Sequence, residues 1–242
     1  MIKVAVISDL HGNMEALASV LIDIEKNNAD KIFILGDFSL VGPEPDEIIS
    51  YIKELSKKLD ITSIQGNTDL MILNNINDSM PEIFKNAIKY SQDNISESNK
   101  EFLRNLPSSL SVKIGETQIL LVHGSPRKND ENIFPNLDTE KVKEIISGTK
   151  ENLILCGHTH LPCGYQIDKK TVVKVGSVGR PFTGDNKACY VLLEIDEHET
   201  NSFSVTHKFV DFDVISASEK IRAQNFKGAD IIADLLLKSS AS

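Results

Sequence analysis

The sequence predicts an α/β fold, and two recurring patterns indicate it. Short apolar runs rich in β-branched residues end abruptly at a polar residue beside glycine, as buried strands that lead into loops do. Amphipathic helical patterns lie between the first of these runs, and this alternation of strands and helices is typical of α/β proteins. The strand pattern occurs in five runs: 4–7, 32–35, 61–64, 119–122 and 153–155.

Two helices are expected between the first three strands. Asn13 is placed to cap a helix over 14–27, because it directly precedes apolar residues that recur at helical spacing. The segment 46–58 repeats this spacing, with isoleucines and a leucine on one side. Each helix therefore has one apolar face that can pack on a sheet.

The segment at about 70–107 is expected to be a helical insertion between strands. Residues 81–106 have a helical pattern with a polar interruption near 91–99. Pro107 ends this pattern, because proline lacks the N–H that a continuing helix needs.

The second half of the chain is richer in strands, and we expect them to form a mixed or antiparallel sheet. An amphipathic helical stretch over 214–238 follows and is expected to pack back onto the protein. We expect residues 1–242 to form one domain. The strands expected in this half are 110–114, 118–122, 153–156, 164–167, 171–175, 189–195 and 203–210.

Composition excludes several classes of protein. The 26 Lys and Arg against 35 Asp and Glu give a net charge of −9, which disfavours stable binding to nucleic acid. No apolar run has the length of about 18 residues that a membrane span needs. The first residues do not resemble a secretory signal, and three cysteines do not suggest a disulfide framework. We therefore expect a cytoplasmic protein with no membrane partner.

Polar side chains that can bind metal ions follow the predicted strands. An isolated aspartate after a strand is usually a turn or cap residue, and an isolated histidine is usually structural. Here, however, four of the six histidines fall at strand ends, where the loops of an α/β fold converge. The convergence predicts a site for two metal ions. The candidate ligands are Asp9, His11, Asp37, Asn67, His123, His158 and His160.

These motifs resemble, in order and approximate spacing, those of the calcineurin-like metallophosphoesterases, and in particular a poorly characterised prokaryotic branch of that superfamily. The resemblance implies two facing mixed β-sheets flanked by helices. The blocks that carry it are Asp9-Leu10-His11, Gly36-Asp37, Gly66-Asn67, Val122-His123-Gly124 and Gly157-His158-Thr159-His160.

The resemblance also implies how two divalent ions would be held. One ion would bind Asp9, His11, Asp37 and His160, and the other would bind Asp37, Asn67, His123 and His158, so that Asp37 is the bridge. A ligand set without thiolate suits Mn, Fe, Co, Ni or Zn. The implied reaction is hydrolysis of a phosphodiester in a small phosphate-ester substrate, by attack of a metal-bridging hydroxide.

Other residues of the implied site either contact substrate or depart from the family pattern. Asn67, Arg127 and Arg180 are candidates to bind the substrate anion. Where many relatives have a histidine that protonates the leaving group, this chain has Thr68, which leaves Asp69 as the nearest candidate acid. Asp37 and Asn67 are the other candidate catalytic residues.

Two alternatives to a phosphodiesterase remain open. One is a phosphatase of small phosphorylated metabolites. The other is a metal-binding, non-catalytic scaffold for protein interaction, a role for which the absence of a histidine at position 68 is an argument. The stretch 38–43 lacks arginine, which disfavours protein Ser/Thr phosphatases and diadenosine tetraphosphate hydrolases.

Overall fold

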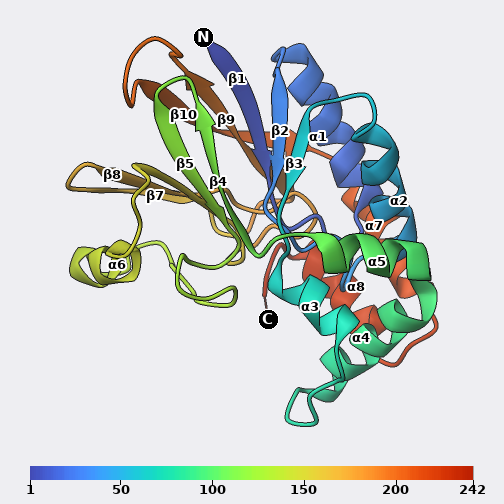
Figure 1. The fold of residues 1–242 in the computed structure, drawn as a ribbon. Helices are drawn as coiled ribbons and strands as arrows, with labels where there is room; N and C mark the ends of the chain where they lie inside the picture. The colour runs from blue at the N-terminus through green and yellow to red at the C-terminus, as the bar shows by residue number, and fades with distance from the viewer. Residues whose placement is uncertain (242) are drawn as a thin grey trace.

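The computed structural model describes residues 1–241 and contains, within them, two five-stranded sheets with helices on their outer faces (Figure 1). In the first sheet the spatial order is β10 (Phe203–Asp211), β9 (Lys187–Ile195), β1 (Ile2–Ile7), β2 (Lys31–Ile34) and β3 (Ile61–Ser63). In the second it is β4 (Ser109–Ile114), β5 (Thr117–Val122), β6 (Leu153–Cys156), β8 (Lys170–Lys174) and β7 (Cys163–Ile167).

Both sheets are mixed. In the first, β1, β2 and β3 are parallel, whereas β9 and β10 join as an antiparallel pair. In the second, β5, β6 and β8 are parallel and the two edge strands are antiparallel to their neighbours. The predicted α/β fold with two facing mixed sheets is confirmed.

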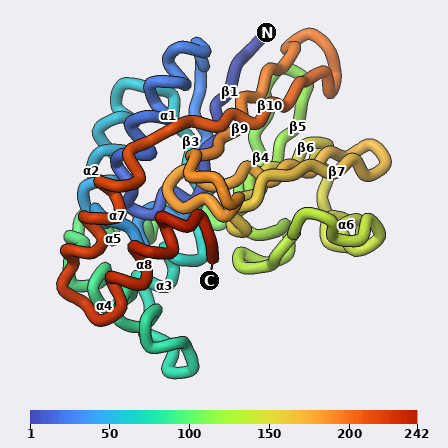
Figure 2. Tube along the Cα trace, turned by 180° about the vertical axis from the view of Figure 1, so that it is seen from behind, coloured from blue at the N-terminus to red at the C-terminus, as the bar shows by residue number. Residues whose placement is uncertain are grey.

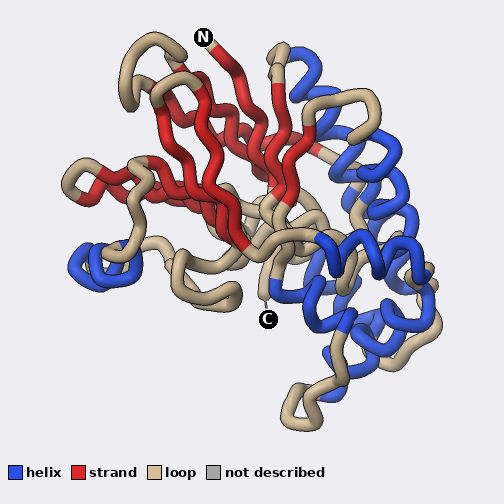
Figure 3. The backbone as a smooth tube through the Cα atoms, in the orientation of Figure 1, coloured by secondary structure: helices blue, strands red, loops and turns tan. Residues whose placement is uncertain are grey.

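The core between the sheets is built from alternate residues of their strands. Val4 and Val6 of β1 pack in one cluster with Leu121 of β5 and Leu155 of β6. Their neighbours in sequence point the other way, and Ala5 and Ile7 belong to the cluster under the helices. This period of two explains why the strands read as continuous apolar runs, since both faces of the sheet are covered. Figure 3 shows the two strand layers.

Most helices cover the outer face of the first sheet. They include α1 (Met14–Lys26), α2 (Pro45–Leu55), α7 (Val214–Arg222) and α8 (Ala229–Leu237), and α1 contacts both β10 and α7. Figure 2 shows α1 and α7 on the same side of the sheet. The helix α6 (Thr139–Ile146) covers the second sheet through a separate apolar cluster. Among the helices of residues 1–241, none has the length and apolar character that crossing a membrane requires.

The helical segments are divided more finely than the sequence patterns indicated. The expected helix 81–106 is two helices, α4 (Glu82–Asn94) and α5 (Glu97–Asn105), because Ser96 caps a new helix inside the polar interruption. The stretch 214–238 is likewise divided into α7 and α8 before Gly228, which has a φ of 103°. The helices α3 (Asn67–Leu73) and α6 were not expected; both are short.

Candidate metal centre

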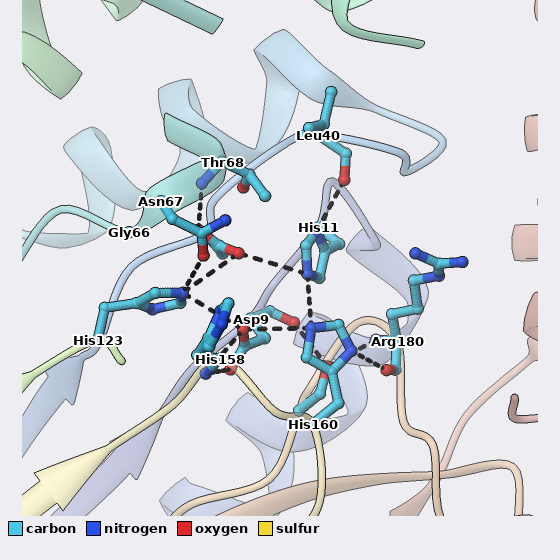
Figure 4. A network of polar contacts seen from close by, with 12 residues as sticks. Asp9, His11, Leu40, Gly66, Asn67, Thr68, His123, His158, His160 and Arg180 are labelled. Atoms are coloured by element: carbon cyan, nitrogen blue, oxygen red, sulfur yellow. Dashed lines mark hydrogen bonds and ion pairs between the residues drawn. The ribbon is translucent and has the colours of Figure 1, made fainter. Parts of the chain in front are cut away.

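The seven candidate ligands come together at one end of the two sheets, and six of them are labelled in Figure 4. Asp9 and His11 follow β1, Asp37 follows β2, and Asn67 begins α3 just after β3. The remaining three come from the second sheet, where His123 follows β5 and both His158 and His160 follow β6. The site therefore lies where the carboxyl ends of parallel strands from both sheets meet.

The backbone is strained at most of these positions. Five of the seven residues have a φ in the left-handed region, where residues other than glycine are uncommon and strain is associated with functional sites. The values are 55° at Asp9, 45° at His11, 57° at Asp37, 74° at His158 and 58° at His160. Aspartate and histidine tolerate this conformation better than β-branched residues do.

Glycine lets two of the loops approach each other. A Cβ on Gly66 would lie 2.1 Å from Oδ1 of Asp37, so no larger residue fits before Asn67 without displacing that carboxylate. The backbone N–H of Thr68 donates to the same Oδ1 at 2.9 Å. The absence of a side chain at Gly66 thus allows the loop after β3 to pack directly against Asp37.

Backbone carbonyls fix the orientation of three imidazole rings. Since a carbonyl oxygen can only accept a hydrogen bond, the Nδ1 atom of each ring carries the hydrogen and Nε2 is turned toward the centre of the site. The hydrogen bonds run from His11 to the carbonyl of Leu40 (2.7 Å), from His123 to that of Leu35 (2.6 Å) and from His160 to that of Arg180 (2.6 Å).

The inward-facing atoms of these rings could hold a cation. The Nε2 atoms of His11 and His160 lie 3.1 Å apart. If both rings are neutral and carry their hydrogen on Nδ1, each Nε2 has a lone pair, and the two lone pairs face each other. Oδ1 of Asp9 is 3.3 Å from Nε2 of His160, which adds a third electron-rich atom. A metal ion converts this repulsion into coordination, so the donor set fits a divalent ion.

A second group of ligand atoms adjoins the first. Nε2 of His123 lies 3.3 Å from Oδ2 of Asp37, 3.9 Å from Oδ1 of Asp9 and 2.9 Å from Oδ1 of Asn67. Two triads have ligand atoms close enough to share an ion: Asp9, His11 and His160, and Asp9, Asp37 and His123. Asp9 is common to both triads. Oδ2 of Asp37 also lies 3.8 Å from Nε2 of His11, which places this carboxylate between His11 and His123.

His158 stands at the edge of this cluster. Its backbone N–H contacts both carboxylate oxygens of Asp9 at 3.1 and 3.2 Å, and its ring lies 5.3 Å from that of His123 between centroids. The side chain is only partly buried and faces the cavity described below.

Burial and charge set the protonation of the cluster. Burial lowers the pKa of His11 to about 4, and repulsion from His160 adds to the shift. Burial opposes the charge on His123 too, but the carboxylates of Asp37 and Asp9 outweigh it and raise the pKa of His123 to about 9. Burial raises the pKa of Asp37, and the nearby His123 more than compensates and holds it below its usual value. An ion that binds His123 must therefore displace a proton at neutral pH.

Asp69 lies behind Asp37, fully buried, and both of its oxygens accept backbone N–H groups. Oδ2 accepts from Asp37 at 2.9 Å and from Gly66 at 2.8 Å, and Oδ1 accepts from Phe38 at 2.9 Å. Burial and then the charge of Asp37 raise the pKa of Asp69 to about 7. Asp69 is not among the residues that line the cavity, and its hydrogen bonds join the loop after β2 to the loop after β3.

A cavity of about 380 Å³ opens beside the ligand cluster, and only one of the two candidate arginines lines it. Arg180 lines it, with its guanidinium directed past His11 (Figure 4). Arg127 does not line it, because its guanidinium pairs with Glu131 and lies 3.0 Å from Glu144. The charge of Arg127 is already balanced, so this residue is not part of the site proposed below.

Phe182 is a site residue that the sequence patterns did not indicate. Its ring stacks on that of His160, with 4.2 Å between centroids and an angle of 23°, and the guanidinium of Arg180 lies 5.3 Å from its centroid. Its only sequence signal was its place two residues after Arg180. The carbonyls that orient the histidines carry no sequence signal.

Comparisons with known proteins agree with this fold. A sequence model of the calcineurin-like phosphoesterase superfamily domain matches residues 2–198. An uncharacterised protein of Methanocaldococcus jannaschii is 32% identical over 236 residues, covering 90% of this chain and 91% of its relative. A hypothetical protein from Pyrococcus horikoshii OT3 has a similar solved structure, with a TM-score of 0.85, 26% identity and coverage of 96% and 98% of the two chains. A metallophosphoesterase from Sphaerobacter thermophilus shares the fold at a TM-score of 0.80 and 23% identity, covering 98% and 99%.

Proposed function

The chain belongs to the calcineurin-like phosphoesterase superfamily, and from this premise we propose that it is an enzyme that hydrolyses a phosphodiester with the help of two divalent metal ions. The observation that supports this most strongly is the convergence of imidazole nitrogens and carboxylate oxygens at one place, with the Nε2 atoms of His11 and His160 3.1 Å apart. A divalent ion bound between these two nitrogens would replace their mutual repulsion with coordination.

The ligands divide into two overlapping sets. We assign Asp9, His11, Asp37 and His160 to one ion, and Asp37, Asn67, His123 and His158 to the other. Bound there, the ions would supply Lewis acidity toward the phosphate and lower the pKa of a water molecule. Oxygen and imidazole donors without thiolate suit Mn, Fe, Co, Ni or Zn.

The remaining residues of the site bind and orient the ester. Arg180, 7% exposed, offers a guanidinium to the anion. The Asn67 side chain, which lines the cavity, can contact a phosphate oxygen through its amide. During hydrolysis a P–O bond forms to the oxygen of water as the P–O bond to the leaving alcohol breaks, and that alcohol takes up a proton.

Thr68 determines which esters are hydrolysed well. Thr68 lines the cavity, and its buried hydroxyl has no hydrogen-bond partner within residues 1–241; a threonine hydroxyl is not an acid near neutral pH. Since Asp69 is turned toward backbone N–H groups, no acid of this loop protonates the leaving group. Esters with an acidic leaving group, such as p-nitrophenol, should therefore react much faster than alkyl esters.

Turnover of metal-loaded protein tests the proposal. Protein stripped with a chelator and reloaded with Mn²⁺ is given bis(p-nitrophenyl) phosphate or p-nitrophenyl phosphate, and released p-nitrophenolate is measured. We expect the diester to be hydrolysed and Asp37→Asn to abolish the activity, while His198→Ala, in an exposed turn, retains it. Hydrolysis of the monoester alone would favour the metabolite phosphatase. Full metal binding without any turnover would favour the non-catalytic scaffold.

A further inference from the structure

The cavity beside the ligand cluster has two chemically different sides. One side consists of the polar residues already described, and the other is apolar and aromatic. The apolar side is built from the loop after β2, from α3, from the start of α4 and from the turn after Arg180. Its residues are Leu40, Val41, Met71, Met80, Pro81, Phe84 and Phe182.

Phe84 is the most informative residue of this side. Its side chain is 39% exposed although large apolar side chains are usually covered, and it stands at the edge of the cavity. Met80 and Met71 lie beside it in the lining, and methionine side chains adapt to the shape of an apolar ligand. An apolar group entering the cavity would cover all three.

Arg180 provides an unpaired positive charge in the cavity lining. Of the described residues that line the cavity, it is the one lysine or arginine, and within residues 1–241 it has no carboxylate at ion-pair distance. Its Nε has no hydrogen-bond partner within the same residues. This guanidinium can therefore contact the one anionic charge that a phosphodiester carries.

We propose that the preferred substrate is a singly charged phosphodiester with an apolar or aromatic substituent, which Phe84, Met80 and Met71 cover while Arg180 contacts the phosphate. This inference rests on the proposed function for the reaction, but the preference for an apolar substituent is a property of binding alone. It selects against sugar phosphates and nucleoside polyphosphates, whose hydroxyls and charges would meet an apolar wall.

Two esters with a common leaving group test the selectivity in turnover. Phenyl p-nitrophenyl phosphate and methyl p-nitrophenyl phosphate differ only in the substituent that stays on phosphorus. We expect kcat/KM to be at least about tenfold higher for the phenyl ester, which is about 1.4 kcal/mol. Phe84→Ala and Met80→Ala should each reduce this ratio to about threefold or less. Phe209→Ala, which removes a phenylalanine 51% exposed on β10, should leave the ratio unchanged.

Binding of inert analogues separates the inference from the proposed function. Diphenylphosphinate and dimethylphosphinate are monoanions that cannot be hydrolysed, and calorimetry measures their affinity for the Mn²⁺-loaded protein. We expect diphenylphosphinate to bind about tenfold tighter than dimethylphosphinate. Phe84→Ala should lower the affinity for diphenylphosphinate only, whereas Arg180→Met should lower the affinity for both ligands. Equal affinities, or a preference that Phe84→Ala and Met80→Ala leave intact, would overturn the inference. A preference in binding without turnover of any ester would overturn the phosphodiesterase proposal and leave the inference standing.

Discussion

Removal of the Asp69 carboxylate should destabilise the protein strongly, because this buried group accepts three backbone hydrogen bonds. In Asp69→Ala three buried backbone N–H groups, those of Asp37, Phe38 and Gly66, lose their acceptor. At about 1 kcal/mol for each unsatisfied donor, the loss in free energy of unfolding is about 3 kcal/mol. Asp69→Asn retains one oxygen, which can serve the two donors that share Oδ2, and should lose about 1 kcal/mol.

Urea unfolding in the presence of a chelator measures this loss without any contribution from bound metal. With an m-value of about 3 kcal/mol/M for a chain of this size, Asp69→Ala should lower the midpoint by about 1 M. Asp93→Ala, which removes an exposed carboxylate, should change it little. Metal affinity should also fall, by about 10- to 100-fold, because Asp37 loses its support. An Asp69→Ala midpoint within about 0.2 M of the wild type would refute the reasoning.

Four further predictions concern the ligands and their neighbours. Asp37→Asn should lose most bound metal, measured by elemental analysis; full occupancy would contradict its assignment to both ions. His11→Gly should be about 1 kcal/mol more stable than His11→Ala in chelator, because the φ of 45° strains alanine; equal urea midpoints would argue against strain. The pKa of His123 is raised to about 9, and a protonated ring cannot bind a metal ion, so metal affinity should fall about tenfold per pH unit from pH 9 to 6. Chelator competition measures this affinity, and an affinity that does not change with pH would exclude His123 as a ligand. Thr68→His should raise kcat on alkyl diesters by about tenfold or more and change p-nitrophenyl diesters little; equal loss on both would assign Thr68 to packing.

Strand ends were the most predictable part of the molecule. The runs before Asp9, Asp37 and His123 are apolar on both faces, so the sequence pattern marks both the strand and the point at which it stops. Once the strands are parallel, their carboxyl ends must share one edge, and the convergence of the ligands follows. The short helices α3 and α6 were not predicted, because seven or eight residues give too few turns for a helical period to be recognised.

Side-chain roles that depend on neighbours in space were less predictable. Asp69 and Arg127 had been expected near the reaction because they adjoin ligand motifs. In the structure, Asp69 accepts hydrogen bonds from three backbone N–H groups up to 32 residues away in sequence. Arg127 pairs with two glutamates, the farther of which is 17 residues away. The left-handed φ of His158 and His160 likewise depends on the loop being held at both ends by the assembled sheets.

Because its residues come from both sheets, the candidate metal site would, with an ion bound, also be a cross-link between the two halves of the sandwich. Asp9 and His158 meet across 149 residues of sequence, so the site forms only after the chain has closed this long loop. An ion present at one hundred times its dissociation constant would add about 2.7 kcal/mol against separation of the sheets. Metal supply should therefore set how long the folded protein survives heat or protease, independently of any catalytic turnover.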